Sequence, residues 1–223
     1  LDRLRVSAAE PMFLDLCDAL DSMLVLFMNR PEETSKIVDR VIDSPSCTPL
    51  ALAWAAAAGA VARAVTGRLD DVAPLADRGL EAARIAESGM LSFTIGLGQT
   101  LALLASGQPD AARRVAVEHA DLAEMQQPGR AQAGVVLGRV LIATGAIEAA
   151  CDELRQASAV LESTSYAWAM MAPTYVAQAY AIAGETAQAR DALRRAEGHH
   201  GTRSALFEPD LHLARAWVAA SAG

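Results

Sequence analysis

Apolar residues recur along this chain at helical spacing and are interrupted at intervals by single turn residues. In the first segment Leu16, Leu20, Met23, Leu24 and Phe27 fall three or four apart, the spacing of one helix face. Glycine or asparagine follows such segments, because both tolerate the left-handed conformation that closes a helix. The pattern predicts helices over about residues 4–28, 32–43, 49–66, 70–87, 91–106, 109–125, 130–144, 148–162, 166–183, 185–197 and 209–221. Thr48 is a candidate N-cap of the third helix, and Ser88-Gly89 is predicted to end the fourth.

The turn residues are evenly spaced. They are Asn29, Gly67, Gly107, Gly145, Gly184 and Gly223, separated by 38, 40, 38, 39 and 39 residues. Such a period indicates an internal repeat of about 39 residues, in which each unit is a helical hairpin. We predict one helical-repeat domain over 1–223, with hairpins at about 4–44, 48–87, 91–125, 130–162 and 166–197 and a half-repeat at 205–223.

Small residues lie at fixed distances from the turn residues. Seven before each stand Ser22, Ala60, Thr100, Gly138, Ala177 and Ala216, and five after stand Thr34, Val72, Ala112, Ala150 and Ala189. Small residues that face each other let two helices pack closely. One hairpin cannot bury both of its faces, so neighbouring hairpins must stack. The predicted fold is all-α, a right-handed superhelix of helical hairpins.

Two units carry a small–large–small order. They read Gly138…Leu141…Gly145…Ala150…Leu154…Ala157 and Ala177…Tyr180…Gly184…Ala189…Leu193…Ala196. This order resembles the tetratricopeptide repeat. The chain departs from that motif in its period, about 39 residues rather than roughly 34, and in having no regular proline that closes the second helix.

Longer repeats of this kind look like the helical-repeat region of large LuxR-type, MalT-like transcriptional regulators, and the tail Leu211–Gly223 looks especially like the actinobacterial members. In those proteins an ATPase precedes the repeats and a helix-turn-helix domain follows them. The resemblance implies a sensor and scaffold segment, which binds an effector or protein partner in its concave groove and relays this to absent domains. The alternative is a protein–protein interaction scaffold or a self-associating homo-oligomer without a small-molecule ligand.

Charge narrows the range of partners. The formal net charge is −8 and the isoelectric point is about 5.0. Nucleic-acid affinity rests on Lys and Arg that replace counterions, so we expect no direct nucleic-acid binding by this segment. The longest nearly apolar run, Pro49–Ala62, is shorter than the roughly 20 residues a bilayer needs, so we expect no membrane insertion.

Three scattered cysteines, Cys17, Cys47 and Cys151, form neither a disulfide framework nor a metal motif. They are typical of a reducing compartment, so we expect a cytoplasmic location. The chain begins without Met and ends within its repeat pattern at Gly223, from which we expect a fragment of a longer protein.

Candidate chemistry is sparse. The Gly96–Thr100 stretch resembles a phosphate loop but has no lysine and lies within a predicted helix. His199 and His200 lie in a loop, and His119 falls on the seam between helices, where a buried, hydrogen-bonded histidine is expected. The acidic residues gather at the starts of second helices, where they complement the helix dipole. These acidic residues are Glu32, Glu33, Asp70, Asp71, Asp110, Glu148 and Glu185. We therefore expect no enzyme activity, no cofactor and no metal site.

The remaining candidate site is the side of the first helices that points away from the seam. That side includes Trp54, Met171 and Asp210, and the candidate cluster on it consists of Gln132, Arg139, Thr174 and Gln178, flanked by Trp217. A mixed aromatic and polar lining suits a sugar or a peptide. The alternative interpretation is ordinary exposed polar residues with a packed tryptophan. If these residues bind a ligand, substitution of Arg139 and Gln178 is expected to weaken binding without lowering the melting temperature.

Overall fold

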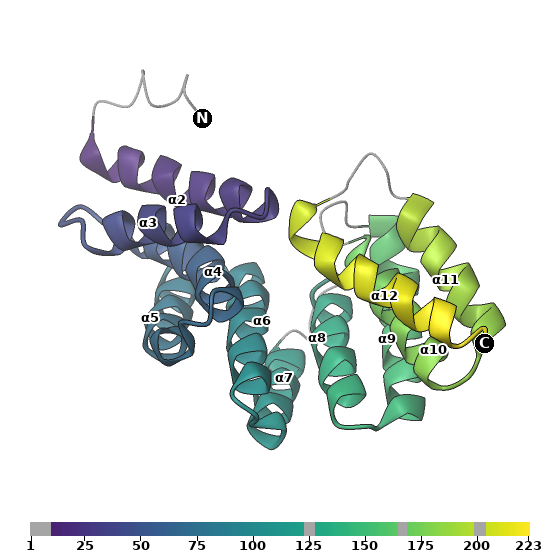
Figure 1. The fold of residues 1–223 in the computed structure, drawn as a ribbon. Coiled ribbons are helices and arrows are strands. Elements are labelled where there is room, and N and C mark those ends of the chain that lie inside the picture. Colours follow the sequence, from purple (N-terminus) through teal and green to yellow (C-terminus); the bar gives the residue numbers. More distant parts are fainter. Residues whose placement is uncertain (1–9, 123–127, 165–168, 199–203) are drawn as a thin grey trace. The chain divides into compact units, whose positions relative to one another are not determined.

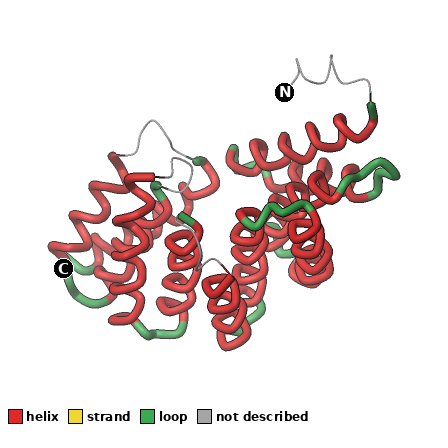
Figure 2. Tube along the Cα trace, turned by 180° about the vertical axis from the view of Figure 1, so that it is seen from behind, coloured by secondary structure: helices red, strands yellow, loops and turns green. Residues whose placement is uncertain are grey.

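A computed structural model describes residues 10–122, 128–164, 169–198 and 204–223. Within these ranges all regular structure is helical (Figure 2), which confirms the predicted all-α class. The first helices of the hairpins are α2 (Pro11–Phe27), α4 (Pro49–Val65), α6 (Met90–Ala105), α8 (Gly129–Ala143), α10 (Met171–Ile182) and α12 (Glu208–Ala220). The second helices are α3 (Pro31–Ile42), α5 (Val72–Ile85), α7 (Pro109–Leu122), α9 (Ile147–Thr164) and α11 (Thr186–Gly198). Two 3₁₀ turns, η1 (Leu69–Asp71) and η3 (Ala205–Phe207), precede α5 and α12.

The predicted turn residues are confirmed. Asn29 has a φ of 58°, and the five glycines have φ between 69° and 88°. In the hairpin at Gly145 the Ala146 amide donates to the Leu141 carbonyl at 2.9 Å, which closes the helix end. No atom lies within 4 Å of a Cβ built on Gly145, so the glycine is required for its backbone conformation and not for space.

Helix starts and ends differ from the prediction in a few places. Thr48 caps α4 as predicted, since its hydroxyl accepts from the Ala51 amide at 3.2 Å. Between α5 and α6, however, Glu87 takes the left-handed conformation with a φ of 51°, while Gly89 is right-handed and is the N-cap of α6. The helix α9 continues to Thr164, past the predicted loop. The predicted helical residues 4–9, 123–125 and 166–168, together with His199 and His200, lie outside the described residues.

The chain divides into two compact units, Leu1–Val115 (unit 1) and Ala116–Gly223 (unit 2), with the boundary inside α7. In unit 1, α4 packs against α2, α3, α5 and α6; in unit 2, α10 packs against α8, α9, α11 and α12 (Figure 1). Each unit therefore has a first helix at its centre that is buried along most of its length. Whether the units behave as one repeat domain over 1–223 stays a prediction.

The small-residue seam is buried. The residues seven before and five after each turn residue are buried, except Ala216 near the end of α12. At Gly138 an added Cβ would collide with Leu154, which shows that glycine leaves room there for a large residue of α9. A Cβ on Gly98 would lie 2.5 Å from the carbonyl carbon of Ala60, so the α6 and α4 backbones approach closely.

Candidate functional site

The five predicted site residues all belong to unit 2, on three first helices. Gln132 and Arg139 come from α8, Thr174 and Gln178 from α10, and Trp217 from α12. Two of the five, Arg139 and Gln178, converge on Asp210 near the start of α12. Thr174, Gln132 and Trp217 are not part of this convergence.

Arg139 is the centre of a polar cluster. Its Nη1 donates to the Tyr175 hydroxyl, its Nη2 lies 3.6 Å from Asp210 Oδ1, and its Cζ lies 5.1 Å from the centroid of the Tyr175 ring. The side chains of Arg139 and Asp210 are 30% and 20% exposed, so the ion pair is only partly screened by water. The cluster joins α8, α10 and α12.

Burial and charge fix the protonation states in this cluster. Burial acts to lower the pKa of Arg139, but the neighbouring Tyr175 and Asp210 outweigh it and raise that pKa. Burial is also the main reason that the pKa of Tyr175 is raised well above its usual range. Arg139 is therefore a cation and Tyr175 a neutral phenol at any physiological pH. Neither of these two groups is ready to exchange a proton.

Gln178 and Thr174 are used inside the unit. Gln178 is buried and its Nε2 donates to the Asp210 backbone carbonyl at 3.0 Å. Thr174 is fully buried, and its hydroxyl donates to the Met170 carbonyl one turn earlier at 2.7 Å. The sequence placed both on an open groove, whereas in the structure neither side chain faces solvent. The reason is that the neighbouring first helices pack against this side of α10.

Gln132 and Trp217 remain accessible. Gln132 is half-buried on α8, and Trp217 is 42% exposed on α12. Arg139 and Gln178 hold the helices of unit 2 together, so their substitution should lower the melting temperature. This expectation differs from the one drawn from the sequence, in which substitution of these residues leaves the melting temperature unchanged.

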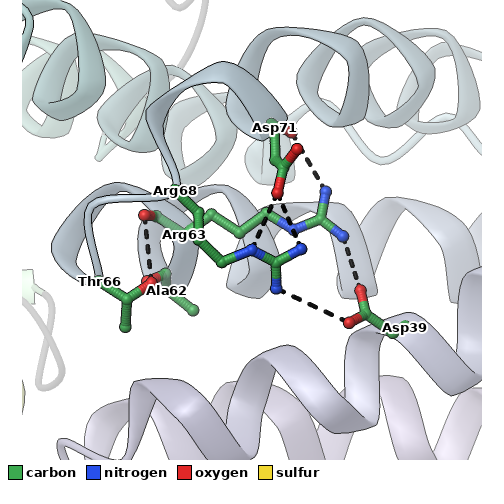
Figure 3. A network of polar contacts seen from close by, with 6 residues as sticks. All are labelled: Asp39, Ala62, Arg63, Thr66, Arg68 and Asp71. Carbon is green, nitrogen blue, oxygen red and sulfur yellow. Dashed lines mark hydrogen bonds and ion pairs between the residues drawn. The ribbon is translucent and has the colours of Figure 1, made fainter.

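Unit 1 has its polar cluster at another place in the hairpin (Figure 3). The buried Arg63 of α4 donates to Asp39 Oδ1 of α3 at 2.7 Å and to the Asp71 carbonyl at 3.1 Å. Arg68, in the turn, lies 2.8 Å from Asp71 Oδ2 and 3.8 Å from Asp39 Oδ2. These contacts join one hairpin to the second helix of the hairpin before it. We interpret this cluster as structural, because the buried guanidinium of Arg63 already donates to Asp39 and to the Asp71 carbonyl.

The other candidate residues have structural roles. Gly96 and Gly98 lie within α6, as predicted, so they form no phosphate loop. Acidic residues occupy the first turn of α3, α7 and α9 and the turn η1. His119 is buried on α7, and burial lowers its pKa. Among the described residues, no group of three or more His, Cys, Asp or Glu could hold a metal, and no helix is long and apolar enough to cross a bilayer.

Tyr175 was missed by the sequence prediction, whereas Asp210 was predicted on this side of the first helices but left out of the candidate cluster. One signal could have found Tyr175. It stands nine residues before its turn residue, and Arg139 stands six before the preceding one. The same two positions meet in unit 1, where a Cβ on Gly98 would lie 2.7 Å from the Val61 amide nitrogen. The contacts between two successive first helices in unit 1, transferred to unit 2 by the repeat, would have placed Tyr175 next to Arg139.

Comparison with solved structures shows the fold. The chain is similar to the crystal structure of nearly identical TPR-like repeats from a kinesin light chain-like protein of Podosopora anserina, with a TM-score of 0.54, 17% identity, and coverage of 86% of this chain and 97% of that one. A single-substitution variant of the same protein gives 0.53 and 16%, covering 82% and 92%. Neither a protein-family model nor a curated protein matches the chain. The fold is thus a tetratricopeptide-like helical repeat.

Proposed function

We propose that the chain is a protein-interaction scaffold, which binds a peptide segment of a partner protein on the first-helix face of unit 2. The observation that carries this proposal is the exposed Trp217, seven residues after Asp210 and therefore on the same side of α12. Exposed tryptophans are frequent anchors of protein contacts. Gln132 and the accessible part of Arg139 supply polar contacts, while Thr174 and Gln178 support α10 from within.

A peptide fits this surface better than a small effector. Small-molecule sites are concave and present convergent polar groups to the ligand. Here Thr174 and Gln178, two of the polar groups expected to converge, donate to backbone carbonyls of the chain itself. The groups that remain are spread over α8 and α12. A catalytic role has no support from this arrangement, so we propose a scaffold that is not an enzyme.

The test uses a random peptide library displayed on phage and selected on the immobilised chain. The dissociation constants of the selected peptides are then measured by calorimetry. Trp217→Ala and Gln132→Ala should weaken binding, by about tenfold or more for Trp217, because an anchor at the centre of an interface carries much of its affinity. Met90→Ala, at an exposed site on α6 of unit 1, is the control. Peptides that bind all the proteins equally, or a selection that yields none, would refute this surface.

The finer hypothesis is that the scaffold is the sensor segment of a LuxR-type regulator in the cytoplasm, with an effector or a protein as its partner. Its support is the period of about 39 residues and the tail Leu211–Gly223. The parent gene decides the matter. A GxxxxGK[ST] motif upstream and a helix-turn-helix downstream would support the regulator, and a parent protein with neither would exclude it.

A further inference from the structure

Two large apolar side chains lie exposed beside the turns of unit 1. Val65, two residues before its turn residue, is 49% exposed, and Met28, directly before its own, is 60% exposed. The hairpins that turn at Gly107 and Gly145 are also exposed at these two positions, but there they have small or polar residues, namely Ala105, Ser106, Ala143 and Thr144. The exposure thus belongs to the repeat position, whereas the large apolar side chains are a feature of unit 1.

Leu69 adds to the apolar surface beside Val65. It lies in η1, four residues after Val65, and it packs against a buried cluster formed by Ala60, Ala64, Val72 and Ala102. Leu69 is only half-buried, so part of its side chain stays accessible. Because Ala64 directly precedes Val65, the buried cluster lies beneath the turn that Val65 and Leu69 flank. We call Met28, Val65 and Leu69 the turn patch.

The first two turns of unit 1 lie on the same edge of that unit. The Ser44 hydroxyl, after α3, donates to Asp15 Oδ2 near the start of α2 at 2.8 Å, which shows that α2 and α3 run antiparallel. The helix α4 follows α3 after a short loop and packs on both α2 and α3, so it is antiparallel to α3. The helices α2 and α4 therefore run in the same direction, and Met28 and Val65 stand at their neighbouring C-terminal ends.

An exposed carboxylate follows each turn of unit 1. It stands three residues after the turn residue and belongs to Glu32, Asp70 or Asp110. Within the described part of the chain, no arginine or lysine forms an ion pair with any of these three. Glu33, by contrast, is paired with Arg30 at 2.5 Å. The three carboxylates complement the dipole of the helical turn in which they lie, but their charge still faces solvent and attracts cations.

We propose that the turn patch and these three carboxylates bind a cationic, amphipathic segment of a partner protein. Apolar side chains of that segment pack on Met28, Val65 and Leu69, and its lysine or arginine side chains lie against the carboxylates. Methionine suits such a surface, because its flexible thioether adapts to partners of different shape. The site is in unit 1, so it is additional to the peptide contact proposed for α8 and α12.

Charge decides which occupant fits this site. A second copy of the chain carries a net charge of −8, and an anionic lipid surface is also negative, so the unpaired carboxylates repel both. A neutral apolar segment packs on the turn patch but leaves the carboxylates unpaired. A cationic amphipathic segment satisfies both parts of the site. Its binding should weaken as salt rises, because salt screens exposed ion pairs.

The test uses two labelled synthetic helical peptides, with leucine along one face and either lysine or glutamate along the other. Their binding to the full chain is measured by fluorescence anisotropy at low and at high salt. At low salt the lysine peptide should bind at least about tenfold more tightly than the glutamate peptide, because complementary charges attract across an interface and like charges repel. This preference should shrink at high salt.

Matched substitutions locate the site. Val65→Lys should weaken binding of the lysine peptide at least about tenfold, because it removes an apolar contact and adds a like charge. Ala143→Lys adds the same charge at the same repeat position of unit 2, so it should change binding by less than about twofold. Asp70→Asn should weaken binding about threefold, as expected for an exposed ion pair, whereas Glu148→Gln, at the equivalent position of unit 2, should not. All four positions are exposed, so the melting temperatures should stay unchanged.

Equal losses in Val65→Lys and Ala143→Lys would show attraction by net charge alone and overturn the proposal, and so would equal binding of the two peptides. Binding of the chain to phosphatidylglycerol vesicles that Val65→Lys abolishes would make the turn patch a lipid contact and overturn it as well. Trp217→Ala should leave binding of the lysine peptide unaffected. If that variant lost the peptide and Val65→Lys kept it, this inference would be refuted while the proposed function would be supported.

Discussion

Units 1 and 2 are built from the same hairpins, yet they join their first helices differently. Six residues before the turn residue, unit 1 has Met23 and Val61, both buried and apolar. At that position unit 2 has Arg139 and Gln178, which both contact Asp210 on α12. Unit 1 thus holds its first helices by apolar contact and close approach, and unit 2 holds its own partly by polar bonds.

In unit 1 the polar cluster is centred two repeat positions later than Arg139 and Gln178 are in unit 2. Arg63 stands four before its turn residue and points to α3 and η1, away from the first-helix joint. Apolar contact is non-directional and tolerates a change of shape if volume is kept. A bonded polar cluster needs every partner in place. The comparison indicates that one fold supports two kinds of joint, the first sensitive to volume and the second to the identity of its partners.

The largest effect on stability is expected from a substitution that adds side-chain volume between α4 and α6 in unit 1. Gly98→Val places side-chain atoms where even a Cβ would lie 2.5 Å from the Ala60 backbone, and no rotamer change relieves a backbone collision. Valine is a better helix residue than glycine, which alone would stabilise by a few tenths of a kcal/mol. Overpacking outweighs this, so we expect a loss of about 3 kcal/mol in the free energy of unfolding. Urea denaturation measures it.

The control for this substitution is Gly89→Ala. Gly89 is right-handed and no atom lies within 4 Å of its added Cβ, so its stability should change by less than about 0.5 kcal/mol. Hydrogen exchange should show lost protection in α4 and α6 of the Gly98→Val protein. Equal protection in all helices, with unchanged stability, would mean that the two backbones separate at little cost.

The sequence could predict features that follow from local chemistry. Asn29 and the five glycines were predicted because few residues accept a left-handed turn, and Thr48 because its hydroxyl can cap a helix. The burial of Thr174 could not be predicted, because the pattern assigns a side of a helix but not what covers that side. Tyr175 was missed for the same reason, since its partner Arg139 is 36 residues away. Glu87 was missed because glutamate carries no preference for its left-handed conformation.

A smaller effect on stability is expected from a substitution that removes the polar contacts among α8, α10 and α12 in unit 2. Arg139→Ala removes the bond to Tyr175 and the ion pair with Asp210, and it leaves a buried phenol with one partner fewer. The partial exposure of Arg139 and Asp210 reduces the loss, so we expect about 2 kcal/mol. Thermal unfolding followed by circular dichroism measures it, and lost protection should concentrate in α8, α10 and α12.

A double-mutant cycle isolates the pair. Arg139→Ala and Tyr175→Phe should give a coupling free energy of about 1 kcal/mol, because the two side chains share one bond and one ring contact. Val61→Ala with Tyr175→Phe, which are in different units, should be additive. A coupling near zero would show that the contact between Arg139 and Tyr175 adds nothing to the stability of unit 2.

The smallest effects concern the turns, where the units again differ. Unit 1 has two non-glycine residues in the left-handed conformation, Asn29 and Glu87, whereas the described part of unit 2 has none. Gly145→Ala should lower the free energy of unfolding by about 1 kcal/mol, since space is free and only the conformation is unfavourable.

Glu87→Gly should raise the free energy of unfolding by about 0.5 kcal/mol, because relief of the left-handed glutamate exceeds the added chain entropy of glycine. Asn29→Gly should change little, as asparagine already accepts this conformation. Opposite signs for Gly145→Ala and Glu87→Gly in urea denaturation would confirm that unit 1 tolerates strained turns, and a loss at Glu87→Gly would show that its side chain stabilises the turn by contacts.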